Sequence, residues 1–221
     1  MRWLILNNEL SIKQNNLPDR PTTAQTGKTN VNVNNQAGGT INFNYNFNYQ
    51  QTADSSAETM IAIQSFSKEY YQLIVTCDEN VFNEGVVSVS TNRALTKYNV
   101  PQEIFDRCST LSNEGIEELK RFPAIICQEN TEVNGVTSPN QFCMFAYIQK
   151  VMVIGKTVKI AFKPIAPIQQ IKLCDKRNAM FFDLNMDCAI TDLNHSAWSV
   201  HKVNVFEAFK EAGIPGMPTP M

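Results

Sequence analysis

The sequence contains no long apolar run. No stretch approaches the roughly 20 apolar residues of a membrane-spanning helix, and the opening MRWLILNNEL has too short an apolar run for the core of a secretory signal. Cysteine occurs six times but never as a C-x-x-C pair, and several cysteines lie inside apolar runs, where a free thiol behaves as a small buried hydrophobe. These absences predict a soluble protein of the reducing cytoplasm, with neither a membrane-spanning helix nor a disulfide framework.

Positive charge is not in excess either. The net charge is −2, from 19 Lys and Arg against 21 Asp and Glu, whereas nucleic-acid-binding proteins usually concentrate basic side chains on one surface. The glycines stand singly, or lack the helix and the lysine that follow a phosphate-binding loop. We therefore expect no nucleic-acid partner, no membrane partner and no cofactor.

The composition changes near residue 57. Residues 1–57 are rich in Asn, Gln and Thr, and the stretch between Lys28 and Asp54 has no charged side chain at all. From Met60 onward, apolar runs alternate with turn residues and charged positions, as in a packed domain. The boundary falls in the small, polar stretch 51–59, which is typical of a linker. We predict a leader over 1–57 and a globular domain over 58–221.

The domain pattern predicts an α+β fold, a compact antiparallel sheet or partial barrel with about three helices. Apolar and β-branched runs predict strands, and a long buried hairpin turns at Gly155. Proline and capping residues mark the helix starts at Pro101, Ser112 and Asn204. The expected strands, besides the hairpin within 141–164, are 70–76, 86–90, 124–128, 169–173 and 180–184.

The leader contains the most unusual pattern, INFNYNFNY at 41–49. Side chains in a strand alternate between its faces, so aromatic and aliphatic residues line one face and asparagines the other. The stretch VNVNNQ at 31–36 alternates in the same way, and Gly38 and Gly39 between the two stretches permit a tight turn. We predict a hairpin or β-arch over 29–50 whose faces are formed by Val31, Val33, Ile41, Asn42, Phe43, Asn44, Tyr45, Asn46, Phe47, Asn48 and Tyr49.

The apolar row of this arch needs a cover, because an isolated hairpin is marginal in water. One alternative is that the arch adds two strands to its own domain, although asparagine is disfavoured in strands. A second is pairing between copies of the chain, where stacked asparagines form amide ladders and no Lys or Pro in 29–50 opposes it. A third is an oligomeric membrane pore with asparagines facing the lumen. We predict the second, so that the arch is an oligomerisation segment.

The only local group of chemically active residues lies between Asp192 and His201. Asp192, His195 and His201 are candidate catalytic residues in this run. Two histidines six positions apart lack the i, i+4 spacing of a helical metal site, so we expect no metal. The alternative is structural, with Trp198 as a core anchor and the histidines as partly exposed polar residues.

Three segments resemble a family of bacterial proteins that has no assigned activity. They are NRALTKYNVP (92–101), GIEELKRFPAIICQENT (115–131) and VNVFEAFKEAGIP (203–215). Similar sequences carry R-T-H-W-A before the last helix, where this chain has NHSAWSVH (194–201), without the arginine and with His separated from Trp. The resemblance covers most of 70–215 and implies a bacterial or phage-related cytoplasmic source. The Asn-rich leader resembles those of bacterial anti-phage defence proteins.

The leader carries the functional prediction. We expect a non-enzymatic, homo-oligomeric scaffold, sensor or accessory subunit that assembles through the β-arch, in the setting of phage defence, with another protein of the same system as a further partner. The first alternative is a small hydrolase or nuclease that uses the Asp192–His201 region. The second is an oligomeric pore-forming β-hairpin protein.

Overall fold

The structure, a computed structural model, describes residues 53–221. The chain divides into two units between Gln50 and Gln51, and all the described residues lie in the second. The predicted β-arch over 29–50, with all its oligomerisation residues, lies outside the described residues.

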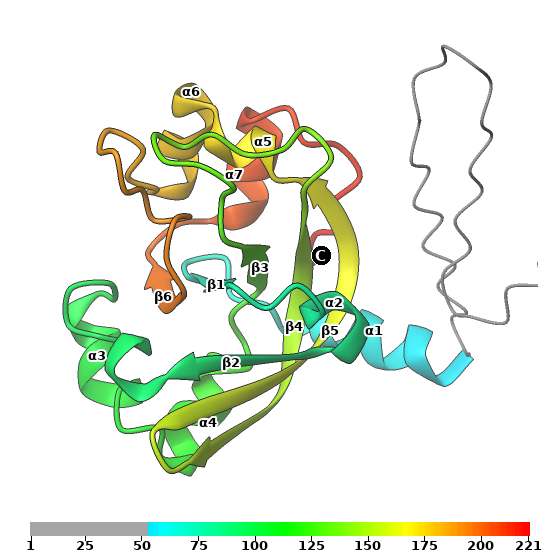
Figure 1. Ribbon diagram of the computed structural model, residues 1–221. Coiled ribbons are helices and arrows are strands. Elements are labelled where there is room, and N and C mark those ends of the chain that lie inside the picture. The colour runs from blue at the N-terminus through cyan, green and yellow to red at the C-terminus, as the bar shows by residue number, and fades with distance from the viewer. Residues whose placement is uncertain (1–52) are drawn as a thin grey trace, which may run out of the picture. The chain divides into compact units, whose positions relative to one another are not determined.

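A curled six-stranded sheet forms the centre of the domain (Figure 1). Its strand order is β2-β5-β4-β3-β1-β6. Neighbouring strands are antiparallel except β1 and β3, which are parallel. The strands are β1 (Tyr71–Thr76), β2 (Val86–Ser90), β3 (Ala124–Gln128), β4 (Phe142–Ile154), β5 (Thr157–Gln169) and β6 (Ala197–His201).

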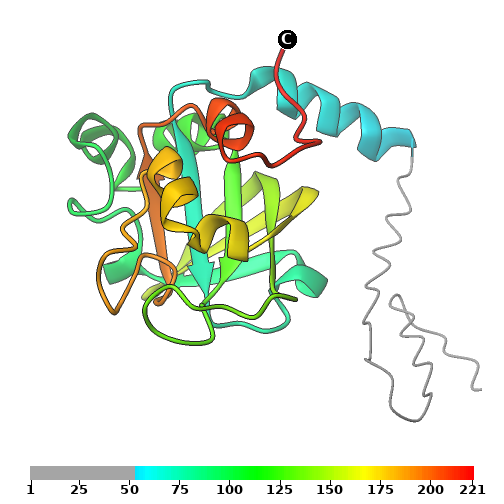
Figure 2. The ribbon, with the colours of Figure 1, turned by 90° about the horizontal axis from the view of Figure 1, so that it is seen from above.

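Short helices connect the strands and cover the sheet. Figure 2, seen from above, shows α5 and α6 in front of the strands. The α-helices of the described residues are α1 (Ala53–Ser65), α2 (Val81–Glu84), α3 (Gln102–Cys108), α4 (Asn113–Leu119), α5 (Ile171–Cys174), α6 (Lys176–Ala179) and α7 (Val205–Glu211), with 3-10 turns η1 (Thr91–Arg93) and η2 (Met180–Phe182). No helix within 53–221 is long and apolar enough to cross a membrane.

The two faces of the sheet carry two separate apolar cores. Alternation along β1 directs Tyr71, Leu73 and Val75 into the first core, which α1, α5, α6, η2 and α7 close. Phe145 lies at its centre and packs edge-on against rings of α7. Ile74 points into the second core, which is closed by α2, α3 and α4.

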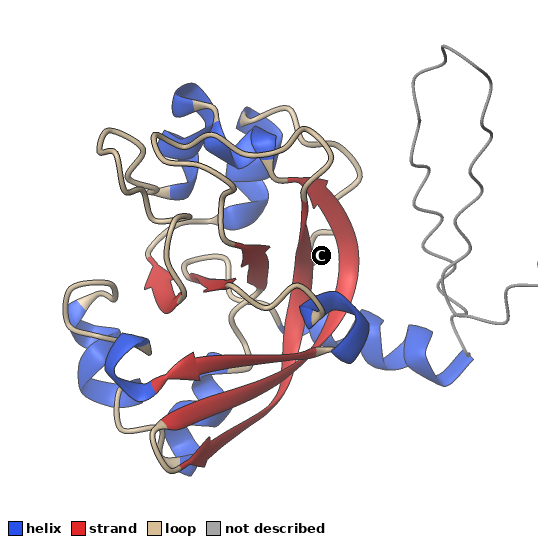
Figure 3. Ribbon diagram, in the orientation of Figure 1, coloured by secondary structure: helices blue, strands red, loops and turns tan. Residues whose placement is uncertain are grey.

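The long hairpin β4–β5 joins the two halves of the domain. Its register shifts between Phe145 and Ala146 and again between Ile148 and Lys150, and such bulges bend and twist a strand pair. Beyond the second shift, β4 and β5 continue beside β2 (Figure 3). There one face packs on the second core and the other is exposed. We call this part, Lys150–Ala161, the distal hairpin.

The predicted α+β class and partial barrel are confirmed. Strands occur at 71–76, 86–90 and 124–128, and the predicted hairpin turns at Gly155. Two predicted caps are also present. The side chain of Ser112 accepts a hydrogen bond from the Gly115 backbone N–H, and that of Asn204 accepts one from the Phe206 N–H.

Other predictions are wrong. The sheet is mixed, because β1 pairs in parallel with β3 across a connection that contains β2, α3 and α4. The strands expected at 169–173 and 180–184 are mostly helical turns, α5 and η2. Between them Asp175 caps α6 by accepting a hydrogen bond from the Arg177 N–H. Residues 53–59 of the expected linker belong to α1, and more than three helices are present.

Candidate functional site

A cleft of about 480 Å³ lies beside the edge strand β6. Leu73 and Val75 of β1 give it an apolar floor, and polar groups converge on it from β6 and from two loops. An apolar floor with a few convergent polar groups is the usual composition of a small-molecule site. Its further lining residues are Tyr98, Asn99, Val100, Pro101, Asp183, Asn185, Asp192, His195, Ala197, Ser199, Val200, His201 and Lys202.

Three side chains in this cleft form a hydrogen-bonded chain. Ser199 and His201 are two positions apart on β6 and therefore share a face of the strand. The Ser199 Oγ lies 3.0 Å from His201 Nε2, and His201 Nδ1 lies 3.3 Å from Asp183 Oδ2. The order hydroxyl, imidazole, carboxylate is that of a nucleophile, its base and the group that orients the base.

The position of the Asp183 carboxylate favours one tautomer of His201. A carboxylate opposite Nδ1 holds a proton on that nitrogen, which leaves Nε2 free to accept the hydroxyl proton of Ser199. The Leu73 carbonyl oxygen competes for this proton, but it lies farther from Oγ, at 3.3 Å. The hydroxyl has one proton to donate, so the shorter contact to His201 is the one that the tautomer favours.

His201 is held in place by Tyr71. The two rings stack with centroids 5.1 Å apart, and the Tyr71 hydroxyl donates a 2.7 Å hydrogen bond to the Phe182 carbonyl. Burial raises the pKa of Tyr71 well above its usual value, so the phenol stays a donor. Asp183 follows directly, with a φ of 55° in the left-handed region. Aspartate adopts this conformation more readily than most non-glycine residues, and here it ends η2 and turns the carboxylate towards His201.

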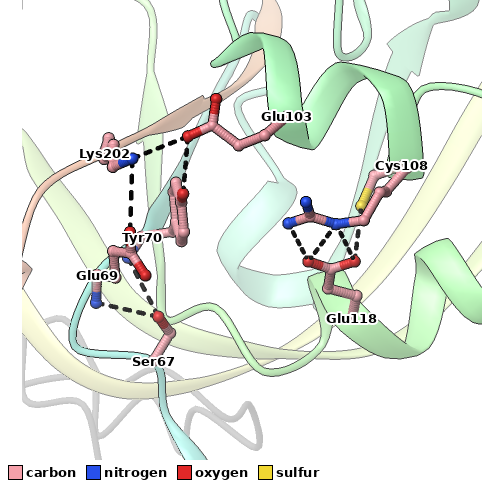
Figure 4. Close-up of polar contacts among 8 residues, drawn as sticks. Ser67, Glu69, Tyr70, Glu103, Cys108, Glu118 and Lys202 are labelled. Atoms are coloured by element: carbon pink, nitrogen blue, oxygen red, sulfur yellow. Dashed lines mark hydrogen bonds and ion pairs between the residues drawn. The ribbon is translucent and has the colours of Figure 1, made fainter.

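An ionic cluster lies at the outer rim of the cleft (Figure 4). Lys202 Nζ lies 2.9 Å from Glu103 Oε1 and 3.5 Å from Glu69 Oε1, and the Tyr70 hydroxyl donates to Glu103 over 2.8 Å. The backbone N–H of Glu103, then Lys202 and Tyr70, lower the pKa of Glu103 to about 2. Two carboxylates thus offset the charge of Lys202, and the remaining charges on the cleft are those of Asp183 and Asp192.

All three catalytic candidates from the sequence line the cleft, in different situations. His201 belongs to the hydrogen-bonded chain. Asp192 closes its own loop, because its Oδ2 accepts a 2.7 Å hydrogen bond from the Asn185 N–H. His195 is exposed at the wall. The core anchor expected at Trp198 is present, since that side chain is fully buried.

Sequence reasoning missed Ser199 and Asp183. Ser196, the hydroxyl next to His195 in the sequence, donates to Glu129 over 2.6 Å and so has a structural role. The available signal was the S-x-H spacing, which places both side chains on one face of a strand. It went unused because the run was not identified as β6.

The cysteines and carboxylates of the described residues are not gathered at one place in the domain. Within 53–221, no three His, Cys, Asp or Glu side chains gather closely enough to hold a metal ion. Asp187, near the candidate histidines in the sequence, pairs with Lys176. All six cysteines are free thiols, and burial raises the pKa of Cys108 to about 12 and that of Cys174 to about 11.

We also compared the chain with protein-family models, with curated proteins and with solved structures, and none of them matches it. The resemblance to a bacterial family therefore stays a prediction, and the interpretation of the cleft rests on its own geometry.

Proposed function

We propose that the domain is a small hydrolase whose nucleophile is Ser199. The observation that carries this proposal is the chain from Ser199 Oγ through His201 to Asp183, with its two contacts of 3.0 and 3.3 Å, in a cleft open to a ligand. This is the enzymatic alternative from the sequence, a hydrolase that uses the Asp192–His201 region, with Ser199 added as its nucleophile and Asp183 as the group that orients His201.

The arrangement suits acyl transfer. Ser199 Oγ attacks a carbonyl carbon of the substrate while His201 Nε2 takes the hydroxyl proton, and Asp183 stabilises the imidazolium that forms. The same proton then passes to the leaving group as its bond to the carbonyl carbon breaks. In the second half, Nε2 takes a proton from water, the resulting hydroxide attacks the acyl group, and Ser199 leaves with its proton restored. The side-chain amides of Asn99 and Asn185 line the cleft as neutral donors. Asn99 Nδ2 already donates to the Trp198 carbonyl over 3.3 Å, so Asn185 is our candidate for stabilising a developing oxyanion.

The cleft also limits the substrate. Its volume of about 480 Å³ fits a small molecule rather than a folded polymer. With Asp183 and Asp192 on the walls and Lys202 already paired, an anionic substrate would be repelled. Neutral or cationic esters and amides are therefore the substrate class that we expect.

The test is hydrolysis of small chromogenic esters by the full chain, with labelling by a fluorophosphonate probe. We expect S199A to lose labelling and to lose kcat on the order of 10⁴-fold, and D183N to lose up to about as much. The matched control is S196A, which removes a neighbouring hydroxyl that takes no part in the Ser199–His201–Asp183 hydrogen bonds, and it should leave the rate unchanged. A wild-type rate equal to that of buffer, or an S199A rate equal to wild type, would refute the proposal.

A second candidate function rests on the leader sequence. We propose that the alternating residues of 29–50 join copies of the chain, as in a scaffold, sensor or accessory subunit of a defence system. It is supported by the absence of charge between Lys28 and Asp54 and by the absence of Lys and Pro from 29–50, since natural edge strands use such residues to prevent pairing.

Light scattering separates the two candidates. We expect the wild-type chain to exceed its monomer mass of 24.9 kDa, and F43K/F47K to return to it, because charges stacked in register repel. The control T22K/T23K adds the same charge to the leader outside the arch and should remain assembled. A monomeric wild-type chain contradicts assembly and leaves the hydrolase proposal untouched.

A further inference from the structure

The turn of the distal hairpin exposes three consecutive large aliphatic side chains. Met152, Val153 and Ile154 are 40, 52 and 55% exposed. They end β4 at the point where the hairpin reverses through Gly155 (Figure 1). Exposed apolar residues are ordinary when scattered singly, but a contiguous group marks an interaction site.

The same part of the chain is strongly basic. Residues 133–174 contain five lysines and no Asp or Glu, although the whole chain has a net charge of −2. Lys163 pairs with Glu58 of α1. Lys150, Lys156 and Lys159 are exposed at the distal hairpin, and none of these three forms an ion pair within the part of the chain that the structure describes.

The strand register brings the two kinds of side chain together. Lys150, Met152 and Ile154 alternate along β4, so they share its exposed face. Lys159 of β5 lies directly opposite Met152. On the other side of β5, the face continues with Ser88 of β2, which lies opposite Lys159. Lys150, Met152, Ile154 and Lys159 therefore form one continuous surface with no carboxylate on its strands. Val153 and Lys156 lie exposed at the turn that ends it.

The geometry points to a peripheral membrane-binding site at the distal hairpin, with an anionic lipid surface as its partner. The aliphatic side chains of the turn enter the boundary between headgroups and acyl chains, and the three lysines contact the anionic headgroups around them. Lysine suits this position because its stem lies along apolar surface while its ammonium group stays in water. The sequence-based expectation of no membrane partner considered only segments that could span a membrane, whereas this surface would bind at the periphery.

Two other partners fit the surface less well. Single-stranded nucleic acid is usually held by aromatic side chains that stack on the bases, and the exposed face of the distal hairpin has none: it carries Val86, Ser88, Ser90, Lys150, Met152, Ile154, Thr157, Lys159 and Ala161. A stable protein interface buries about 800 Å² per partner, whereas a hairpin tip offers only three large aliphatic side chains. A lipid surface needs neither stacking nor a large flat area.

Co-sedimentation of the full chain with vesicles tests this site, independently of both proposed functions. The probes are phosphatidylcholine vesicles with and without phosphatidylserine. We expect binding to the anionic vesicles, a loss of at least about tenfold in M152S/I154S, and a loss of roughly fivefold for each lysine neutralised in K150Q/K159Q. The matched control M180S/I190S removes two exposed aliphatic side chains outside the distal hairpin, Met180 (70% exposed) and Ile190 (59% exposed). It should bind vesicles as wild type does. Far-UV circular dichroism checks that every variant is folded.

Each contrary outcome overturns the proposal. These outcomes are a wild-type chain that stays in the supernatant, equal binding to neutral and anionic vesicles, and distal variants that bind as well as the control. A single-stranded oligonucleotide is titrated in parallel. The surface is a nucleic-acid site instead if the chain binds the oligonucleotide and does not bind vesicles. In that case K150Q/K159Q should weaken oligonucleotide binding, and M152S/I154S should not.

Discussion

The cleft beside β6 and the distal hairpin differ in how their polar side chains are partnered. In the cleft these side chains form hydrogen bonds with one another, whereas the lysines of the distal hairpin have no carboxylate partners among the described residues. Ser199, His201 and Asp183 are linked by hydrogen bonds in the cleft. The lysines of the distal hairpin form no ion pairs within residues 53–221, and aliphatic side chains lie exposed among them. A site that orients reacting groups needs the first arrangement. A surface that binds an anionic lipid surface through unpaired charges needs the second.

The two regions also differ in how their backbone is covered. The outer edge of β6 is occupied, because Leu95 N–H donates to the Trp198 carbonyl over 2.8 Å and Val200 N–H donates to the Asn99 carbonyl over 3.1 Å. An additional strand at this edge would have to displace residues 95–99. The distal hairpin is instead uncovered on one whole face. We therefore expect substitutions near β6 to affect stability more than substitutions on the exposed distal face.

The largest effect should come from Trp198. Its indole is fully buried in the second core, and its Nε1–H donates to Gln72 Oε1 over 3.0 Å. W198A should lower the free energy of unfolding by about 3–5 kcal/mol, because it leaves a cavity. W198F keeps most of the apolar volume and removes only the donor, so its cost should be about 1–3 kcal/mol. Urea unfolding of both variants checks this, and a W198A loss below that of W198F would contradict it.

The next prediction compares the two faces of the distal hairpin. Ile160 points into the second core with no exposed surface, whereas Met152, on the neighbouring strand, is 40% exposed on the opposite face. I160A should cost about 2–4 kcal/mol of unfolding free energy, and M152A less than about 0.5 kcal/mol. The same urea titration measures both. Equal losses would mean that the exposed face is covered in solution, and a membrane could then not reach it.

Local signals in the sequence were sufficient for much of the fold. The caps at Ser112 and Asn204 depend only on a side chain and the next three residues. The hairpin depends on apolar alternation around one glycine. Strand partners could not be predicted in this way, because nothing within Tyr71–Thr76 specifies that it pairs in parallel with Ala124–Gln128.

The candidate sites were harder to predict for related reasons. Asp183 meets His201 only because η2 replaces the strand expected at 180–184 and ends in a left-handed residue. Ser199 can be placed beside His201 only once residues 197–201 are known to form strand β6, because residues two apart share a face in a strand. The basic surface was visible as a run without carboxylates, but its exposure depends on which face of the distal hairpin the second core covers.

The smallest effect should arise at the rim of the cleft. Glu103 has a pKa of about 2 in the folded chain against an ordinary value of 4.5. A depressed carboxyl pKa contributes stability above the unfolded value, and that contribution is lost as the pH falls from 4.5 towards 2. E103Q should therefore be slightly less stable than wild type at neutral pH, and the difference should vanish towards pH 2. Because the Glu103 carboxylate is exposed, solvent screens most of the effect.

Unfolding midpoints between pH 7 and pH 2 measure this stability difference, with E211Q as a glutamate control outside the cluster. A constant difference at every pH would show that Glu103 contributes through packing and not through its charge.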